Sequence, residues 1–359
     1  MLLSKQEDRI KVRSTKKLNA KGIAKIAEIV GSFESVDRYE RTHAPARGRR
    51  LYPFAAMITL CIYIEIKGLT YDGDISQNKL GAMGMPKKKG GYLRPSPARI
   101  SYFLNKEWPE LQKEAGREFA ESVLAMLPSK EFTVDSTPME ASRYSRKYRY
   151  SPHYEIRMAK CHILMCNGYP LVCTFTDAND SDSLELPKLL DMLPDRITGV
   201  KQLTSDGAYP SFANYSKAFS RLGVVMASNP AETAVYHEDR SMDYIERLYS
   251  SVWKDPDYRP GAAPRKMLGL LIKKGKGEEA GKFLRNLDMA RGRRISARYA
   301  RDRHVCETIH RAMKRWMAFD VRGLRKESEE ARKKFKFFTA QILCAVFDPY
   351  YQPDARNRI

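Results

Sequence analysis

The chain has 359 residues, an apolar content of 43%, and 64 Lys and Arg against 43 Asp and Glu, which gives a net charge of +21. This length allows two or three domains, or one core with an insertion. The apolar run at 54–66 is too short for a membrane span, and residues 1–20 lack the apolar segment of a secretory signal.

The excess of positive charge favours a polyanionic partner. Such a charge opposes compaction unless a polyanion neutralises it, and nucleic acid gains affinity when cations on a protein release its counterions. An anionic membrane surface is the rival partner, but no basic amphipathic terminal helix or lipidation motif is present. We therefore expect a cytoplasmic, nucleoid-associated protein that binds DNA or RNA and no membrane.

The first 128 residues are predicted to form a helical domain. A polar, basic arm comes first, and a buried helix is expected at 52–66. A Lys- and Gly-rich loop is expected at 84–95. Ser96 and Pro97 then have the N-cap and first-turn preferences of a helix start, and a further helix should follow at 109–126.

Residues 129–228 are predicted to form an α/β sheet. A short strand ends at Asp135, and two β-type runs flank Asn167-Gly168, which is a strong hairpin signal. Helices are expected at 183–193 and 210–222, and strands at 200–203 and 224–226. The first three strands should form an antiparallel meander. Asp135 and Asp206 would then lie at the carboxyl ends of strands, where open α/β sheets place their sites.

The remaining chain is predicted to be an insertion followed by helices. Residues 229–294 contain scattered prolines and a Lys/Gly-rich stretch, which suggest a mostly helical or loop insertion. A long basic helix is expected at 295–317 and a last helix at 328–347. The segment 295–359 would therefore complete the α/β core.

The six cysteines are predicted to be structural. They are scattered and form no C-x-x-C pair. His304, Cys306 and His310 cluster, but no second ligand pair has spacing suitable for zinc. Disulfides are not expected in a reducing cytoplasm.

Carboxylates after two strands suggest metal-dependent chemistry on phosphates. Transfer of a phosphoryl group is assisted by two divalent ions, and hard ions such as Mg²⁺ bind carboxylate oxygens. Asp135 and Asp206 are candidates, although an Asp after a strand is also a common turn former.

The helix after the insertion offers a third carboxylate. Successive steps of three or four residues lead from Arg303 to Glu307, then to His310 or Arg311, and then to Lys314, so these side chains lie along one face. Glu307 would bind a metal while these cations hold phosphates. The alternative is an exposed face with an ordinary Arg303 to Glu307 ion pair.

Three motifs in this order resemble a known family. They are Thr133-Val134-Asp135-Ser136-Thr137, Leu203-Thr204-Ser205-Asp206-Gly207-Ala208-Tyr209, and Arg303-His304-Val305-Cys306-Glu307 with Lys314-Arg315-Trp316. Together with the hairpin at 168–176 and the loop that follows it, they resemble bacterial and archaeal insertion-sequence transposases of the DDE type. Ala300 departs from the pattern, because the family has a tyrosine three residues before the arginine and Tyr299 lies one place away.

The resemblance implies a ribonuclease-H-like mixed-sheet core and an enzyme that cuts transposon ends and joins the 3′ hydroxyl to target DNA. Asp135, Asp206 and Glu307 would be both the catalytic residues and the ligands of two Mg²⁺ ions, with Mn²⁺ as a substitute. A homodimer on double-stranded DNA is expected, because two ends must be joined. The cations expected to contact DNA are Arg303, Arg311, Lys314, Arg315, Lys160 and Arg99.

Lys160 and Arg99 also suit structural roles. Lys160 lies on a β-type run, where an edge lysine often prevents aggregation. Arg99 would face a groove from the helix that starts at Ser96, although such helices are more often packing units. The Arg- and Tyr-rich stretch 143–150 suits either nucleic acid or a solvated loop.

Two rival functions remain open from the sequence. One is a domesticated or decayed transposase that binds DNA without cutting it, although all three acidic positions are intact. The other is a related metal nuclease that acts on DNA junctions or RNA–DNA hybrids. Strand transfer by the purified protein would exclude this second alternative.

Overall fold

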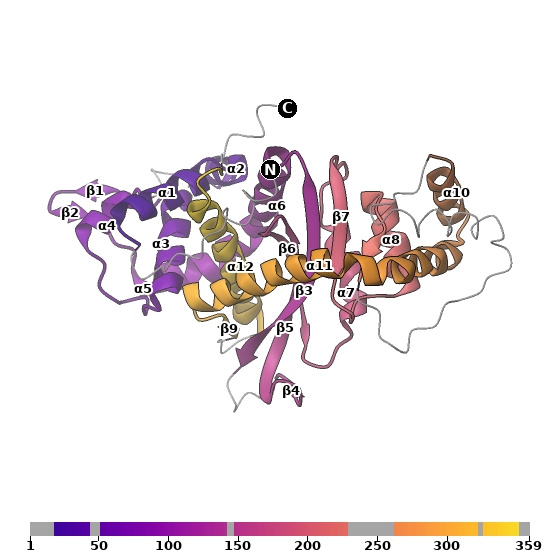
Figure 1. The fold of residues 1–359 in the computed structure, drawn as a ribbon. Helices are drawn as coiled ribbons and strands as arrows, with labels where there is room; N and C mark the ends of the chain where they lie inside the picture. The colour runs from indigo at the N-terminus through magenta and orange to yellow at the C-terminus, as the bar shows by residue number, and fades with distance from the viewer. Residues whose placement is uncertain (1–17, 44–50, 142–146, 229–261, 322–325, 352–359) are drawn as a thin grey trace.

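The computed structural model of the chain describes residues 18–43, 51–141, 147–228, 262–321 and 326–351. Three predicted features therefore lie wholly or partly outside the described residues: the basic N-terminal arm, the Arg- and Tyr-rich stretch 143–150, and the insertion, of which 229–261 is not described. A mixed sheet forms the centre of the molecule, and helices lie on both sides of it (Figure 1).

The sheet has the strand order β6-β5-β3-β7-β8. β3 (Lys130–Ala141), β5 (Ile156–Cys166) and β6 (Tyr169–Asp177) are antiparallel neighbours and form the predicted meander. β7 (Val200–Ser205) and β8 (Met226–Ala227) continue the sheet as parallel strands. Short strands β4 (Tyr150–Ser151) and β9 (Asp320–Val321) pair with β5 and β3. This order confirms the predicted ribonuclease-H-like mixed sheet.

The turn between β5 and β6 forms as its residues predict. Asn167 and Gly168 have φ angles of 50° and 84°, the left-handed conformation that the tight hairpin turn needs. The Asn167 side chain also anchors the turn, because it accepts a hydrogen bond from the Glu131 N–H at 2.8 Å. The hairpin is therefore tied directly to the start of β3.

β3 is longer than predicted. We expected it to end at Asp135, but it continues to Ala141 because its later residues pair with β5, from Ser136 with His162 to Glu140 with Met158. Its parallel pairing with β7 ends where Val134 lies beside Ser205. Asp135 and Asp206 are the next residues on these two neighbouring strands, so they lie at the same level of the sheet. Asp135 is in the middle of β3, and Asp206 comes just after the end of β7.

The chain after β6 adds further helices beside the sheet. A 3-10 turn (Asp182–Leu184) leads into α7 (Glu185–Asp191), and α8 (Phe212–Leu222) follows β7. After α10 (Ala262–Lys273) comes α11 (Gly277–Trp316), which contacts α8, β3 and β7 as it crosses the molecule (Figure 1). The prediction that this helix begins near residue 295 was wrong, because α11 also contains the end of the predicted insertion.

The N-terminal region is helical, as predicted. Its helices are α1 (Ala20–Gly31), α2 (Glu34–Thr42), α3 (Phe54–Lys67), α4 (Gln77–Ala82), α5 (Pro97–Tyr102) and, after a π-helical turn (Phe103–Glu107), α6 (Trp108–Met126). Ser96 caps α5 by accepting a hydrogen bond from the Arg99 N–H. The loop predicted at 84–95 contains a small hairpin of β1 (Lys87–Lys88) and β2 (Gly91–Tyr92), whose Tyr92 ring packs against Gly81.

The last helix joins the two parts of the molecule. α12 (Lys326–Phe347) contacts α1, α3 and α6 on one side and β6 on the other (Figure 1). The Trp108 ring lies 5.0 Å from Phe335 and 4.8 Å from Phe338 between ring centroids. One continuous hydrophobic core therefore spans the N-terminal helices and the sheet.

All six cysteines are buried free thiols, which agrees with a structural role. Burial raises the pKa of Cys166 and of Cys344, which makes these thiols poor nucleophiles. Among the described residues, no helix is both long enough and apolar enough to span a bilayer.

Candidate functional site

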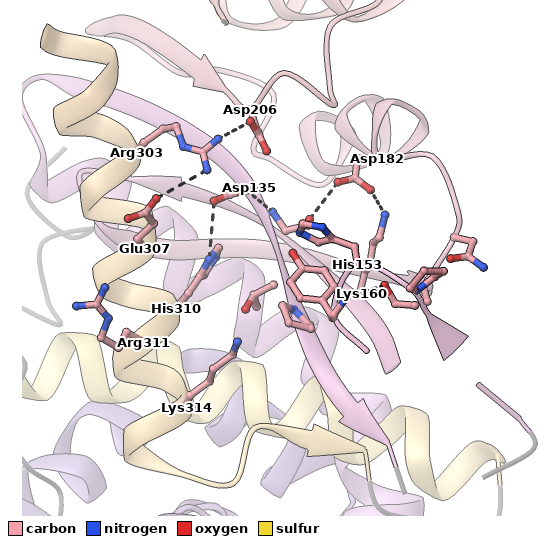
Figure 2. Close-up of a pocket in the computed structure, with 18 residues that line it drawn as sticks. Asp135, His153, Lys160, Asp182, Asp206, Arg303, Glu307, His310, Arg311 and Lys314 are labelled. Atoms are coloured by element: carbon pink, nitrogen blue, oxygen red, sulfur yellow. Dashed lines mark hydrogen bonds and ion pairs between the residues drawn. The ribbon is translucent and has the colours of Figure 1, made fainter. Parts of the chain in front are cut away.

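A cleft of about 890 Å³ lies between α11 and the end of the sheet where β7 stops. Its walls come from segments far apart in the sequence (Figure 2). These are β3, the turn between β4 and β5, β5, the segment after β6, the residue after β7, and α11. All three predicted catalytic residues line it: Asp135, Asp206 and Glu307.

Asp135 forms the buried part of the site. Its side chain is only 11% exposed, and its Oδ1 accepts a hydrogen bond of 2.8 Å from the Ser136 N–H. The pKa of this carboxyl is raised to about 6, chiefly by burial and to a smaller extent by the Asp206 carboxylate, against the positive charge of Arg303, which lowers it. Negative charge at this position is therefore costly without a nearby cation.

Asp206 and Glu307 are more exposed and share a cation. Arg303 donates a hydrogen bond to the Asp206 carboxylate, and its other guanidinium nitrogen lies 3.8 Å from Glu307 Oε1. The backbone N–H of Gly207 also donates to Asp206 Oδ1 at 2.7 Å. The ion pair expected for an ordinary helix face is thus present, but the same guanidinium also connects the helix to the end of β7 (Figure 2).

The side chains suit divalent cations in their chemistry. All three predicted ligands are carboxylates, which are the hard oxygen donors that Mg²⁺ and Mn²⁺ prefer. Burial of Asp135 beside Asp206 gathers negative charge that a cation would neutralise. Within the described ranges, no three His, Cys, Asp or Glu side chains are already close enough together to hold a metal. Arg303 accordingly provides the positive charge between two of the carboxylates.

Comparison with known proteins identifies the family of the chain. Residues 128–342 match the family model described as "Transposase DDE domain", and this match covers more than half of the chain. The chain belongs to the DDE transposase family. No curated protein and no solved structure matches it. Asp135, Asp206 and Glu307 all lie within the matched residues.

A fourth carboxylate, missed in the sequence, lies in the same cleft. Asp182 is buried, and its two oxygens accept hydrogen bonds from Lys160 Nζ at 2.6 Å and Ser136 Oγ at 3.0 Å. Because the Ser136 N–H bonds Asp135, one serine connects both carboxylates. Asp182 directly follows the hairpin and loop that resemble the transposase family. Its place in the sequence was therefore the signal that could have identified it.

Lys160 and His162 have partners inside the protein. Lys160 Nζ also donates to the Asp180 carbonyl at 3.1 Å. The lysine predicted to contact DNA is therefore already bound to Asp182 and the loop before it. His162 is fully buried between Tyr209 Oη at 2.9 Å and Thr176 Oγ1 at 2.8 Å. Burial lowers the pKa of His162. Tyr209 is a buried, packed aromatic residue.

The cationic wall of this cleft comes from α11. Arg303, Arg311 and Lys314 all line the cleft, as their helical spacing predicted (Figure 2). Arg315 is exposed next to them but does not line it. Arg99 lies on α5 outside the cleft and is paired with Glu107 at 2.6 Å.

His310 lies beneath the cationic wall and was not assigned a role from the sequence. Its Nδ1 is 3.9 Å from Asp135 Oδ2, and its Nε2 is buried with no hydrogen-bond partner in the part of the chain that the structure describes. The pKa of His310 is lowered to about 3, chiefly by burial and to a smaller extent by the charges of Lys314 and Arg303. His310 is therefore neutral at physiological pH and adds no cation beside Asp135.

Two rings on the opposite wall were also missed. His153 and the 41% exposed Tyr154 lie on the turn before β5, with ring centroids 4.6 Å apart. Both line the cleft. The side chains at 299–300, where the sequence departs from the family's tyrosine, lie outside those that the structure describes.

Proposed function

We propose that this protein is a DNA transposase that cuts transposon ends and joins the freed 3′ hydroxyl to target DNA with two divalent metal ions. One observation supports this most strongly. Asp135, Asp206 and Glu307, from three separate elements, line one cleft in a chain of the DDE transposase family. The proposed ion is Mg²⁺, with Mn²⁺ as a substitute.

The three carboxylates would hold the ions. When bound, such ions polarise an attacking oxygen and stabilise a departing one. Asp135 has to be ionised to bind a cation, and its pKa of about 6 permits this at physiological pH. The backbone N–H of Ser136 orients one of its oxygens, and that of Gly207 does the same for Asp206.

Cations along α11 would hold double-stranded DNA at the cleft. Arg311 and Lys314 line it beside Glu307, and Arg315 lies next to them. The net charge of +21 supports affinity for phosphates in general. Arg99 and Lys160 would contact DNA only after their ion pairs with carboxylates open. Joining two ends requires a dimer on DNA, and such a protein would be nucleoid-associated.

Cleavage and joining of a labelled DNA that carries the gene's own flanking ends tests the proposal. With Mg²⁺, wild type should cut and join, whereas Glu307→Gln should bind the DNA and lose at least about 100-fold in both reactions. Glu278→Gln is the matched control, because Glu278 lies at the start of the same helix with a side chain 71% exposed. Wild-type activity in Glu307→Gln would contradict the assignment.

A second substrate separates the rival enzyme. The same proteins should be assayed with an RNA–DNA hybrid under the same conditions. Cleavage of the hybrid without joining of DNA ends would favour a related nuclease. DNA binding without any metal-dependent cleavage would favour a DNA-binding derivative of a transposase.

A further inference from the structure

One cation connects two of the three carboxylates. Arg303 donates to Asp206, and its second nitrogen lies 3.8 Å from Glu307 Oε1. Its side chain is 30% exposed, so the contact is partly shielded from water. Figure 2 shows the guanidinium between the two acidic side chains, with a dashed line to each. A planar, delocalised charge suits two carboxylates at once.

The charge of Arg303 also reaches the third carboxylate. The pKa of Asp135 is raised chiefly by burial, and among the surrounding groups Arg303 is the cation that lowers it. His310 Nδ1 lies 3.9 Å from Asp135 Oδ2, but the lowered pKa of this imidazole leaves it neutral. Arg303 therefore partly neutralises the whole acidic site.

We propose that Arg303 is an internal counterion of the metal-free site, which competes with divalent cations for Asp206 and Glu307 and leaves them when DNA binds. This inference rests on the proposed function, because it takes the carboxylates as metal ligands. A metal ion entering the site alone has to break both Arg303 contacts. A DNA phosphate offers the guanidinium two oxygens in return.

The consequence is coupling between DNA and metal. If DNA draws Arg303 away from the carboxylates, it raises the affinity of the site for metal, and metal raises the affinity for DNA by the same factor. The acidic site would then bind metal ions tightly when DNA is present and only weakly when it is absent. This would limit hydrolysis by the protein away from its proper substrate.

Mn²⁺ binding to the full chain without DNA tests the proposal directly. Free Mn²⁺ is measured by electron paramagnetic resonance, so no catalysis is needed. Arg303→Gln should lower the Kd for Mn²⁺ about tenfold, since two partly exposed ion pairs together contribute on the order of that factor. The Kd of Arg303→Lys should lie between those of wild type and Arg303→Gln, because one ammonium group cannot bridge both carboxylates in the same way.

Arg311→Gln is the matched control. Arg311 lies on the same helix, four residues after Glu307, and lines the same cleft. The variant removes the same charge without touching the Asp206 contact, so the Kd should change by less than about twofold. Thermal melting by circular dichroism establishes that each variant is folded.

The outcomes separate this inference from the proposed function. An unchanged or weaker Mn²⁺ affinity in Arg303→Gln, or equal tightening in Arg311→Gln, would overturn the counterion role. Asp206→Asn should abolish most Mn²⁺ binding. If it does so while Arg303→Gln has no effect, only the counterion role fails; if it leaves binding unchanged, the metal site itself is wrong.

Discussion

Asp135 has to satisfy two opposing demands, burial in the fold and ionisation for metal binding. Its carboxyl has a pKa of about 6 in the folded chain against an ordinary value of 3.8. A raised carboxyl pKa means that the folded state holds the proton more tightly than the unfolded state. The contribution of this group to stability is then fully present below its ordinary pKa and is lost as pH rises through about 6.

Asp135→Asn should therefore stabilise the metal-free protein at neutral and alkaline pH. In the presence of a chelator at about pH 8, we expect the free energy of unfolding to rise by about 2 kcal/mol, because the buried charge is gone. The gain should shrink towards about pH 4, where wild-type Asp135 is protonated. Urea unfolding across this pH range measures it. A gain independent of pH would show that the charge of Asp135 is not its cause.

The pair of Lys160 and Asp182 decides between two roles for the lysine. Lys160→Met leaves the Asp182 carboxylate, with a side chain only 9% exposed, without its cation. We expect a loss of about 3 kcal/mol in unfolding free energy. Adding Asp182→Asn should restore part of this loss, and chemical denaturation measures both. If Lys160→Met weakened DNA binding and left stability unchanged, the lysine would be a DNA contact as the sequence suggested.

At the scale of elements, local signals predicted what local forces decide. Asn167-Gly168 predicted the hairpin and Ser96-Pro97 predicted a helix start, because turn and cap preferences act within a few residues. The length of β3 was not predictable in this way. Its continuation past Asp135 depends on β5, whose partner residues lie 18 to 26 positions away in the sequence.

The full length of α11 was missed although its first turns carry an apolar pattern. Ala280, Phe283 and Leu284 have the i, i+3, i+4 spacing of an apolar helix face, and all three are buried in the part of α11 that packs on α8. That packing is close at Gly281, where an added Cβ would meet the backbone of Phe212. Only the folded arrangement shows why a glycine stands in this helix.

Paired glycine substitutions test the packing of α11. Gly281→Ala should lower the free energy of unfolding by about 1–3 kcal/mol, because the new methyl group overlaps the α8 backbone. Gly116→Ala in α6 meets nothing within 4 Å and should raise it by about 0.5–1 kcal/mol. Thermal melting compares the two. Equal, stabilising effects would mean that α11 does not approach α8 closely.

At the scale of the whole molecule, α12 makes the N-terminal helices and the central sheet one unit. Gln341 donates to the Leu171 carbonyl on β6 at 2.7 Å, and Lys25 on α1 donates to the Val346 carbonyl at 3.2 Å. Contacts between residues so far apart in the sequence leave no local pattern. The sequence accordingly predicted separate segments and could not predict their shared core.

Phe338→Ala tests this shared core. The Phe338 ring lies 4.8 Å from Trp108 and 6.2 Å from Phe33 on the N-terminal side. We expect a single unfolding transition in both wild type and the variant. The free energy of unfolding should be lower by about 3–5 kcal/mol in the variant. The unfolding transitions followed by far-UV circular dichroism and by tryptophan fluorescence should coincide. Two transitions, of which only one shifts, would show independent domains.

The central claim is that the acidic side chains of the cleft bind the ions used in DNA cleavage, and a ligand swap at Asp206 tests it most directly. A thiolate binds Mn²⁺ more readily than the harder Mg²⁺. Asp206→Cys should therefore lose DNA cleavage with Mg²⁺ by at least about 100-fold and recover a substantial part of it with Mn²⁺. Wild type should cleave with either ion. Equal activity of Asp206→Cys with both ions, or no recovery with Mn²⁺ in a folded variant that binds DNA, would contradict metal binding by Asp206.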